Sequence, residues 1–427
     1  MKKIAIISEH ASPLAMLGGT DSGGQNVYVA HLARQLARLG YLVDVFTRHD
    51  CDRQARIVHW EDGIRVINVP AGPARFVRKE EMLPLMEEFG RFVLRFARRQ
   101  RVPYDMVHAN FFMSGMVAQL LKAKLDIPFV MTFHALGRVR RLSQGQADGF
   151  PDVRFAIEER LMREADRVIA ECPQDKADMV NLYGADPDRI DVVPCGFDPE
   201  EFWPVTADAR GHLGIDPSEF VILQLGRMVP RKGIDNVIRA LALLRSTHQV
   251  QARLLIVGGN SAQADPVRTP EIGRLMQLAE SLGISDSITF TGQRPRSQLR
   301  IFYTAANVFV TTPWYEPFGI TPVEAMACGT PVIGTAVGGI KTTVVDGHTG
   351  YLVPPNDPAA LARKLAWLQQ HPLTAEHMGW AGMRRANQSY TWRTVARQIA
   401  DVYDAASSDR DVLNAAVRYH QPSQVAG

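Results

Sequence analysis

Two glutamates in the last third of the chain flank a turn that is rich in glycine and proline. Glu316 and Glu324 are eight positions apart, with Gly319 and Pro322 between them and an apolar run at 308–312 before them. This spacing predicts a strand, a loop and then a helix whose first N–H groups can bind an anion. Carboxylates at such a junction can also accept hydrogen bonds from hydroxyl groups. The stretch therefore predicts a ligand with both phosphate and hydroxyl groups, such as a nucleotide sugar.

The same residues also allow a purely structural interpretation. Thr321, Pro322 and Glu324 fit a capping box, in which Thr321 is the N-cap and the glutamate reaches back to the cap amide. This interpretation would explain Glu324 but not Glu316, which stands alone in the loop. Both interpretations stay open for Glu324.

A glycine-rich stretch at 18–26, Gly-Gly-Thr-Asp-Ser-Gly-Gly-Gln-Asn, lies between the first expected strand and the first expected helix. Its amides would meet the positive end of that helix, which favours an anionic ligand over a plain turn. The stretch has neither the G-x-G-x-x-G spacing of a dinucleotide fold nor the lysine of a P-loop. A dinucleotide-binding protein and an NTPase are therefore not supported.

Two cations and a small residue follow strands of the second half. Arg227 and Lys232 come after the first of these strands and could neutralise a diphosphate leaving group without a metal. Arg231, between them, is predicted to be a solvated charge. Gly258 ends the next strand, where the missing side chain would let a nucleotide backbone approach closely.

His134 stands at the end of a strand in the first half, a position that raises the chance of a role in the site only modestly. Several cations of the first half could contribute to a site for a phosphate of the acceptor, although most are expected to be surface charges: Lys79, Arg138, Arg140, Arg141 and Arg154.

Acidic pairs and cysteines give no sign of a metal. Three Asp-x-Asp pairs, at 50–52, 186–188 and 409–411, lie in turn-like or terminal contexts, and we expect them to be solvated. The four cysteines are far apart and lack metal-ligand spacing, which is typical of free thiols in a reducing compartment. We therefore expect no required metal, no cofactor, no disulfide and a cytoplasmic location.

The elements that position these residues alternate along the chain. Apolar runs typical of buried strands occur at 4–8, 42–47, 65–69, 106–109, 129–133, 168–170 and 190–193, and again at 220–225, 253–257, 287–290, 308–312 and 331–334. Helical periodicity marks 27–39, 235–244, 270–282, 297–306, 359–369 and 391–406. This pattern predicts two doubly wound, Rossmann-like α/β domains with parallel sheets that face each other across a cleft.

A stretch without either period, at 194–204, marks the domain boundary. We predict an N-terminal acceptor-binding domain at 1–198 and a C-terminal donor-binding domain at 199–390. A helix at 391–410 should return to the first domain, and 411–427 should form a flexible tail.

The overall composition excludes some partners. The 427 residues carry 48 Lys+Arg against 45 Asp+Glu, a net charge of +3 that is too small for a nucleic-acid binder. No apolar run reaches eighteen residues, so no transmembrane segment is expected. The segment 89–101 mixes arginines with Phe92 and Phe96 and is the candidate for peripheral membrane contact, but a solvated amphipathic helix is the favoured interpretation.

The chain resembles the retaining glycosyltransferases of family 4, which have the two-domain GT-B architecture. The resemblance rests on the E-x7-E stretch of Glu316 and Glu324, the element 226–232, and the run Gly-Gly-Gln-Asn-Val-Tyr at 23–28. Within that family the chain is most similar to the group of sucrose-phosphate synthases, sucrose synthases and inositol-phosphate N-acetylglucosaminyltransferases.

The resemblance implies a role for each site residue. Arg227 and Lys232 would hold the donor diphosphate, and His134 and Glu316 would contact the transferred sugar. The other implied donor-binding residues are Gly23, Gly24, Gly258, Arg294, Phe318, Gly319, Ile320, Thr321 and Glu324. The implied acceptor-binding residues are Gln25, Asn26, Lys79, Asn110, Arg140 and Arg154.

Two positions depart from the inositol-phosphate enzymes. Phe111 and Ala135 stand where those enzymes carry a tyrosine and a threonine, which removes two hydroxyl groups, whereas Lys79 and Arg154 match their phosphate-binding cations. The implied activity is transfer of a hexosyl group from UDP-glucose or UDP-N-acetylglucosamine to a small sugar or polyol, with or without a phosphate. Alternatives are a transferase of polysaccharide or glycolipid assembly at the inner membrane face, a sugar-nucleotide epimerase and a non-catalytic nucleotide-sugar sensor. The oligomeric state stays open.

Overall fold

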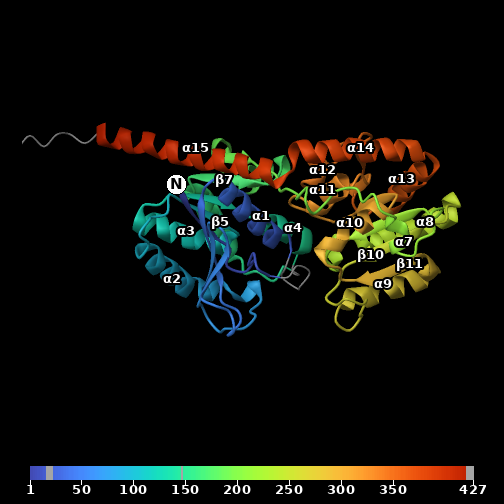
Figure 1. The fold of residues 1–427 in the computed structure, drawn as a ribbon, viewed down its shortest axis with the longest axis horizontal. Coiled ribbons are helices and arrows are strands. Elements are labelled where there is room, and N and C mark those ends of the chain that lie inside the picture. The colour runs from blue at the N-terminus through green and yellow to red at the C-terminus, as the bar shows by residue number, and fades with distance from the viewer. Residues whose placement is uncertain (16–22, 146–147, 420–427) are drawn as a thin grey trace, which may run out of the picture.

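A computed structural model describes residues 1–15, 23–145 and 148–419, with only the backbone for 410–419. It contains two α/β domains side by side, each built on one sheet (Figure 1). The predicted fold class is confirmed, because both sheets are parallel apart from one edge strand and have helices on both faces. Part of the predicted glycine-rich loop, at 18–22, lies outside the described residues.

The N-terminal domain has an eight-stranded sheet in the order β3-β4-β2-β1-β5-β6-β7-β8. Its strands are β1 (Lys3–Ile7), β2 (Leu42–Arg48), β3 (Ile57–Glu61), β4 (Ile64–Val69), β5 (Met106–Asn110), β6 (Phe129–Thr132), β7 (Arg167–Ala170) and β8 (Ile190–Val192). Its α-helices are α1 (Gly24–Arg38), α2 (Met86–Arg98), α3 (Phe112–Leu125), α4 (Gly137–Gln144), α5 (Val153–Glu164) and α6 (Pro173–Tyr183). Short 3-10 helices lie at Lys79–Glu81, Leu83–Leu85 and Pro187–Arg189.

The C-terminal domain has a six-stranded, wholly parallel sheet in the order β11-β10-β9-β12-β13-β14. Its strands are β9 (Val221–Leu225), β10 (Arg253–Val257), β11 (Ile288–Gly292), β12 (Val308–Thr311), β13 (Val332–Thr335) and β14 (Gly350–Val353). Its α-helices are α7 (Ala209–His212), α8 (Ile234–His248), α9 (Pro270–Ser281), α10 (Arg296–Ala305), α11 (Ile320–Ala327), α12 (Ile340–Thr343), α13 (Pro358–Gln370) and α14 (Pro372–Ser389). Short 3-10 helices lie at Pro230–Lys232 and Ser285–Ser287.

The chain crosses between the domains twice at one place. Phe197 N donates to Tyr390 O at 2.8 Å, and Trp392 N donates to Phe197 O at 3.1 Å, so the outgoing and returning segments lie side by side. Phe197 and Trp392 are buried in a core cluster that contains side chains of both domains. The junction is therefore part of a continuous apolar core.

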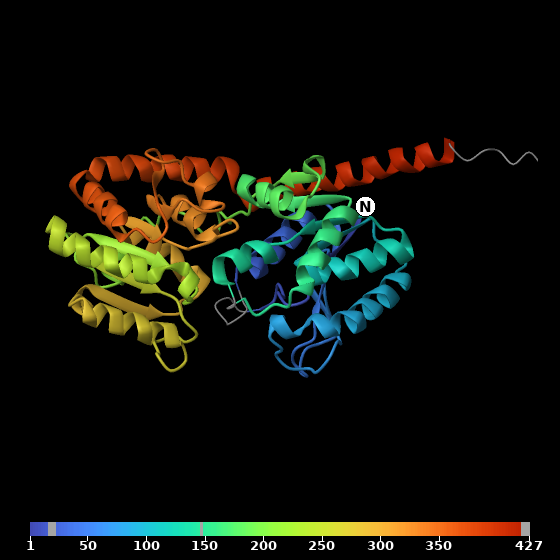
Figure 2. The same ribbon diagram turned by 180° about the vertical axis from the view of Figure 1, so that it is seen from behind.

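The last helix, α15 (Trp392–Tyr419), runs back along the N-terminal domain (Figures 1 and 2). The His108 ring contacts the Tyr403 hydroxyl at 2.7 Å, and Lys2 pairs with Asp404 at 2.5 Å. The helix continues to Tyr419, past position 410 where a tail was expected. Of the predicted tail, 420–427 lies outside the described residues.

Surface features of the N-terminal domain follow from its sequence pattern. Helix α2 buries Met86, Phe89, Val93 and Ala97, while its arginines lie on the other face, as expected for an amphipathic surface helix. None of the helices in the described ranges is long and apolar enough to cross a membrane. The four cysteines are free thiols, and Cys51 is the exposed one.

Candidate active site

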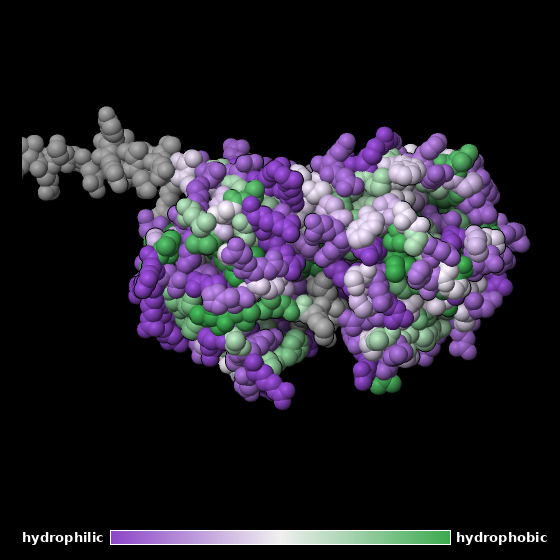
Figure 3. Space-filling view, in the orientation of Figure 1, coloured by the Kyte–Doolittle hydropathy of each residue, from purple (hydrophilic) through white to green (hydrophobic). Residues whose placement is uncertain are grey.

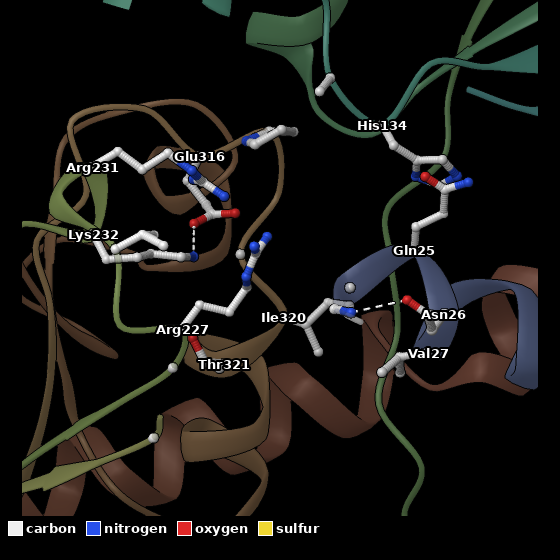
Figure 4. A pocket seen from close by; sticks show the side chains of 18 of the residues that line it. Gln25, Asn26, Val27, His134, Arg227, Arg231, Lys232, Glu316, Ile320 and Thr321 are labelled. Atoms are coloured by element: carbon white, nitrogen blue, oxygen red, sulfur yellow. Dashed lines mark hydrogen bonds and ion pairs between the residues drawn. The ribbon is translucent and has the colours of Figure 1, made fainter. Parts of the chain in front are cut away.

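A cavity of about 780 Å³ lies between the domains and receives residues that follow the carboxyl ends of strands from both sheets. The space-filling view shows a hollow between the two lobes (Figure 3). In the close-up, Lys232 and Glu316 lie on one side, and His134 and Gln25 lie on the other (Figure 4). This is where ligands of doubly wound sheets bind, so the cavity is the candidate active site.

An ion pair between Lys232 and Glu316 is the charged centre of the C-terminal side of the cavity. Burial alone would raise the pKa of the Glu316 carboxyl, but the charges of Lys232 and Arg231 outweigh it and keep that pKa below its ordinary value. Burial lowers the pKa of the Lys232 ammonium, and Glu316 offsets this effect only in part. Arg231 also lines the cavity and donates to Tyr315 O at 3.4 Å, so the prediction of a merely solvated arginine is wrong.

The N-terminus of α11 faces the same cavity. Its N-cap is Gly319, whose φ of 89° is a left-handed conformation that suits glycine. Phe318, Gly319, Ile320 and Thr321 line the cavity, so the first N–H groups of the helix lie where an anion would bind. The predicted capping box is wrong, because Thr321 lies inside the helix and is not its N-cap.

Glu324 is held by two side chains of α10. Its Oε1 accepts a hydrogen bond from Arg296 Nη1 at 2.8 Å, and its Oε2 accepts one from Tyr303 Oη at 3.0 Å. Glu324 is buried, yet it lines the cavity. A buried carboxylate with two fixed donors presents its remaining lone pairs in a defined direction, as recognition of a hydroxyl group requires.

The predicted donor residues Arg227, Gly258 and Arg294 also line the cavity. Gly258 has φ 148°, and a Cβ at this position would lie 2.0 Å from Gly226 O, so no larger residue fits between the two strand ends. Arg294 Nη1 donates to Ala262 O at 2.6 Å, which anchors the guanidinium at the rim.

On the N-terminal side, α1 begins at the cavity and nearly touches the other domain. A Cβ on Gly23 would lie 3.7 Å from Arg227 Cδ, and one on Gly24 would lie 3.6 Å from Ile320 Cδ1. Asn26 Oδ1 accepts a hydrogen bond from Gly23 N at 2.9 Å and closes the first turn of the helix. The predicted glycines and the predicted C-terminal residues therefore meet across the cleft.

Gln25 and Asn110 support the cavity in different ways. Gln25 lines it and donates to Ser8 Oγ at 3.1 Å and to Asn110 O at 3.3 Å. Asn110 is fully buried and does not line the cavity. Its position is therefore that of a support for His134.

His134 is fixed at both ring nitrogens. Its Nδ1 lies 2.7 Å from Glu171 Oε1, and its Nε2 lies 2.9 Å from Asn110 Oδ1. The Tyr28 ring packs edge-on against it at 4.8 Å, and the His134 backbone has a left-handed φ of 58°. Such backbone strain is typical of functional positions.

Glu171 is a cavity residue that the sequence interpretation missed. It follows β7, is buried, and accepts a hydrogen bond from the Cys195 thiol at 3.3 Å as well as contacting His134. Burial, and then the charge of Glu171, raises the pKa of the nearby Asp175 carboxyl to about 8. Asp175 is therefore largely neutral at pH 7, and the acidic side chain in contact with His134 is that of Glu171. The sequence signal that could have identified Glu171 is its position directly after the strand β7.

The predicted acceptor cations divide into two groups. Lys79 and Arg140 line the cavity, and Arg140 pairs with Asp148 at 2.9 Å. Arg154 is fully buried outside the cavity, and its Nε pairs with Glu158 at 2.7 Å.

Three aromatic rings enclose the Arg154 guanidinium, each with its centroid within 5 Å of Cζ: Phe111, Phe112 and Phe150. The prediction that Arg154 contacts a phosphate therefore disagrees with its position. The physical reason is the departure noted above, since the Phe111 ring covers the arginine and Glu158 neutralises it.

A further acidic group lies at the domain junction. His31, Asp198 and Glu201 have ligand atoms within 4.8 Å of one another, close enough to consider a metal. Glu201 Oε2, however, already accepts a hydrogen bond from Arg296 Nε at 2.5 Å, and none of the three residues lines the cavity. The aspartates of the pairs at 50–52 and 186–188 are exposed.

Comparisons with known proteins agree with this arrangement. The family model of Glycosyltransferase Family 4 matches residues 22–201, and that of Glycosyl transferases group 1 matches residues 205–385. The D-inositol 3-phosphate glycosyltransferase of Corynebacterium efficiens is 37% identical over 412 residues, which cover 95% of this chain and 96% of that protein. That of Acidothermus cellulolyticus is 38% identical over 419 residues, covering 96% of this chain and 91% of its own length.

Solved structures show the same fold. Sucrose-phosphate synthase from Thermosynechococcus elongatus has a TM-score of 0.87 and 33% identity, covering 97% of this chain and 100% of that chain. The Anabaena protein HepE in complex with UDP-glucose has a TM-score of 0.70 at 20% identity, covering 95% of this chain and 100% of its own, and supports the fold alone.

Fold and relatives together define an enzyme of GT-B architecture, with its candidate active site in the cavity between the two domains. The chain belongs to the family 4 glycosyltransferases, as its sequence motifs predicted.

Proposed function

We propose that this glycosyltransferase moves a hexosyl group from a UDP-sugar to a small sugar or polyol, with retained anomeric configuration and without a metal. The convergence of Arg227, Lys232, Glu316 and the α11 N-terminus in one cavity, opposite His134, carries the proposal. The cations and the helix would bind the diphosphate, Glu316 would hold the sugar, and Glu324 would take the ribose hydroxyls. His134 would contact the sugar from the acceptor side.

The proposed reaction needs no enzyme nucleophile. The acceptor hydroxyl would attack the anomeric carbon from the face that the nucleoside diphosphate leaves. The bond from that carbon to the phosphate oxygen breaks, and the departing oxygen takes the hydroxyl proton. Lys232, Arg227 and the α11 dipole would stabilise the negative charge on the leaving group, which is the role that a divalent cation has in other transferases.

The nature of the acceptor follows from the relatives and from the lining of the cavity. Relatives act on D-inositol 3-phosphate, and a structural neighbour is a sucrose-phosphate synthase, which favours a sugar-like acceptor. Lys79 and Arg140, the latter paired with Asp148, line the cavity where an acceptor phosphate would approach, whereas Arg154 is enclosed outside it. We therefore propose an acceptor whose phosphate, if present, contacts Lys79 and Arg140.

A panel experiment tests the proposal. The purified full chain would be incubated with UDP-, GDP- and ADP-linked hexoses and with sugars, polyols and their phosphates, and the released nucleoside diphosphate would be measured. Proton NMR of the product would give the anomeric configuration, and a parallel series with EDTA would test for a metal. An inverted product, or loss of turnover with EDTA, would contradict the mechanism. Tight donor binding without release would instead indicate a nucleotide-sugar sensor.

A further inference from the structure

We propose that Arg296 is a positioning residue for recognition of the donor ribose, and that it links the ribose site to the segment that joins the two domains. This inference rests on the proposed function, because it assigns the ribose hydroxyls to Glu324. Neither Arg296 nor its partner Glu201 was singled out by the sequence motifs.

Arg296 bridges two carboxylates from different parts of the chain. Its Nε donates to Glu201 Oε2 at 2.5 Å, and its Nη1 donates to Glu324 Oε1 at 2.8 Å. The guanidinium also stacks on the Phe202 ring, with Cζ 4.7 Å from the centroid. Arg296 lines the cavity at the first residue of α10.

The bridge determines where Glu324 can point. A buried carboxylate needs a cationic or hydrogen-bonding partner, and only 2% of the Glu324 side chain is exposed. Arg296 occupies one of its oxygens and Tyr303 the other. Each oxygen keeps a second lone pair, so a ribose hydroxyl can bind without displacing either protein donor. Without Arg296, the carboxylate would lose its counter-charge and one of its two fixed contacts.

The hydrogen bond from Arg296 to Glu201 connects it to the junction between the domains. Glu201 follows the crossing segment that pairs with Trp392, and it lies 3.7 Å from His31 Nε2 of the N-terminal domain. Burial, and then the charge of Arg296, lowers the pKa of His31 to about 3, so this imidazole is neutral at physiological pH. The neutral ring does not compete with Arg296 as a cation for Glu201.

One guanidinium therefore connects the ribose site with the linker. A movement of Glu201 relative to the C-terminal domain changes the geometry at Glu324, and a ribose bound at Glu324 favours the position of Glu201 seen here. Arg296 Nη2 is buried and has no hydrogen-bond partner in the described part of the chain, so the two carboxylates hold this guanidinium through Nε and Nη1.

The test measures discrimination between ribose and deoxyribose. Isothermal titration would first identify which of UDP, GDP and ADP the wild type binds, and then compare that nucleotide with its 2′-deoxy and 3′-deoxy counterparts. We expect the wild type to prefer the ribonucleotide by about tenfold or more, the effect of a charge-assisted hydrogen bond. Arg296→Met should reduce this preference to near unity, as Glu324→Gln should.

A matched control is available one turn further along α10. The Arg300 guanidinium stacks on Trp203 at 3.8 Å and does not line the cavity, so Arg300→Met should keep the wild-type preference. Arg296→Lys keeps the positive charge but lacks the planar fork whose separate nitrogens contact the two carboxylates, so it should keep part of the preference. If circular dichroism shows that Arg296→Met does not fold, the preference of Arg296→Lys for the ribonucleotide serves as the test instead.

The outcomes separate the two proposals. If the wild type binds none of the three nucleotides, the proposed function fails. If the wild type discriminates but Arg296→Met folds and discriminates equally well, the positioning role of Arg296 is overturned. Glu201→Gln should weaken the preference by a smaller factor, and an unchanged preference in that variant would overturn the link to the domain junction.

Discussion

Replacing Lys232 by alanine tests the most heavily charged part of the site. The lysine ends a 3-10 helix after β9 and forms an ion pair with Glu316 inside the cavity. Alanine removes the ammonium, while Arg227 and Arg231 remain as the other cations that lower the pKa of Glu316. The variant should therefore stay folded and lose one donor to the leaving group.

The size of the effect follows from the chemistry of the leaving group. Removing one preorganised donor to a developing oxyanion costs about 2.7–4 kcal/mol of transition-state stabilisation, or roughly 100- to 1000-fold in rate. Loss of the ion pair should also cost about 1–3 kcal/mol of stability, because Glu316 loses a buried partner. The expected result is a large fall in kcat with a smaller change in thermal stability.

The assay is release of nucleoside diphosphate from the best donor of the panel, at saturating acceptor. Lys364→Ala is a suitable control, since Lys364 stacks on Tyr351 outside the cavity and should leave the rate unchanged. Burial lowers the pKa of Lys232 below its ordinary value of 10.5. As the pH rises, Lys232 should therefore lose its proton, and the wild-type rate should fall, before pH 10.5 is reached. Lys232→Arg, which keeps its charge, should hold its remaining rate to higher pH. A folded Lys232→Ala with full kcat would refute the leaving-group role.

Three further predictions concern a glycine beside the Glu316 backbone, a buried acidic side chain and the independence of turnover from metal ions. Gly338→Ala would place a Cβ 1.8 Å from the backbone oxygen of Glu316 and should cut the rate at least tenfold. Gly283→Ala is the control, because Gly283 also has a positive φ but lies in open space. This control should lose only about 1–2 kcal/mol of stability, with no change in rate. The buried acid is Asp175, whose pKa rises from 3.8 to about 8 on folding, so the free energy of unfolding of the wild type should fall as the pH rises between these values. Asp175→Asn has no proton to lose, so its free energy of unfolding relative to the wild type should grow over this range by at least about 1.4 kcal/mol. Urea unfolding at several pH values measures this difference. A pH-independent difference would contradict that assignment. Turnover should survive EDTA and dialysis, and recovery only on adding a divalent cation would contradict metal independence.

Most of the fold could be predicted because parallel strands with both faces covered are continuous apolar runs. Strand β3 was missed since only alternate residues are partly buried, although the Asp62-Gly63 pair before β4 is a hairpin signal. Strand β14 was missed because its four residues, Gly-Tyr-Leu-Val, are too short a run to separate from a turn. In both cases the missed strand lies at a sheet edge, where fewer side chains are buried and the run of apolar residues in the sequence is therefore weakest.

The site could be predicted where a residue follows a strand or begins a helix, because topology alone brings such positions to the cleft. Arg227, Lys232, Glu316 and His134 are of this kind. Arg154 is different, because its environment depends on aromatic side chains and on a glutamate of its own helix that only tertiary packing brings around it. Residue type and resemblance could not show that a positive charge was already neutralised.

The pairing of cations with carboxylates explains how this cleft can be both stable and reactive. Uncompensated charges would be costly at the exposures found here, 17% for the Lys232 side chain and 14% for Glu316. Glu316 balances the charge of Lys232, and Glu324 balances that of Arg296. In the proposed function, a nucleotide-sugar donor would bring negative charge to Lys232 and hydroxyl groups to the carboxylates, so each partner would gain a new interaction while keeping the old one. We therefore expect the cavity to bind an anion joined to a polyol more tightly than either group alone, since each alone would satisfy only one side of these pairs.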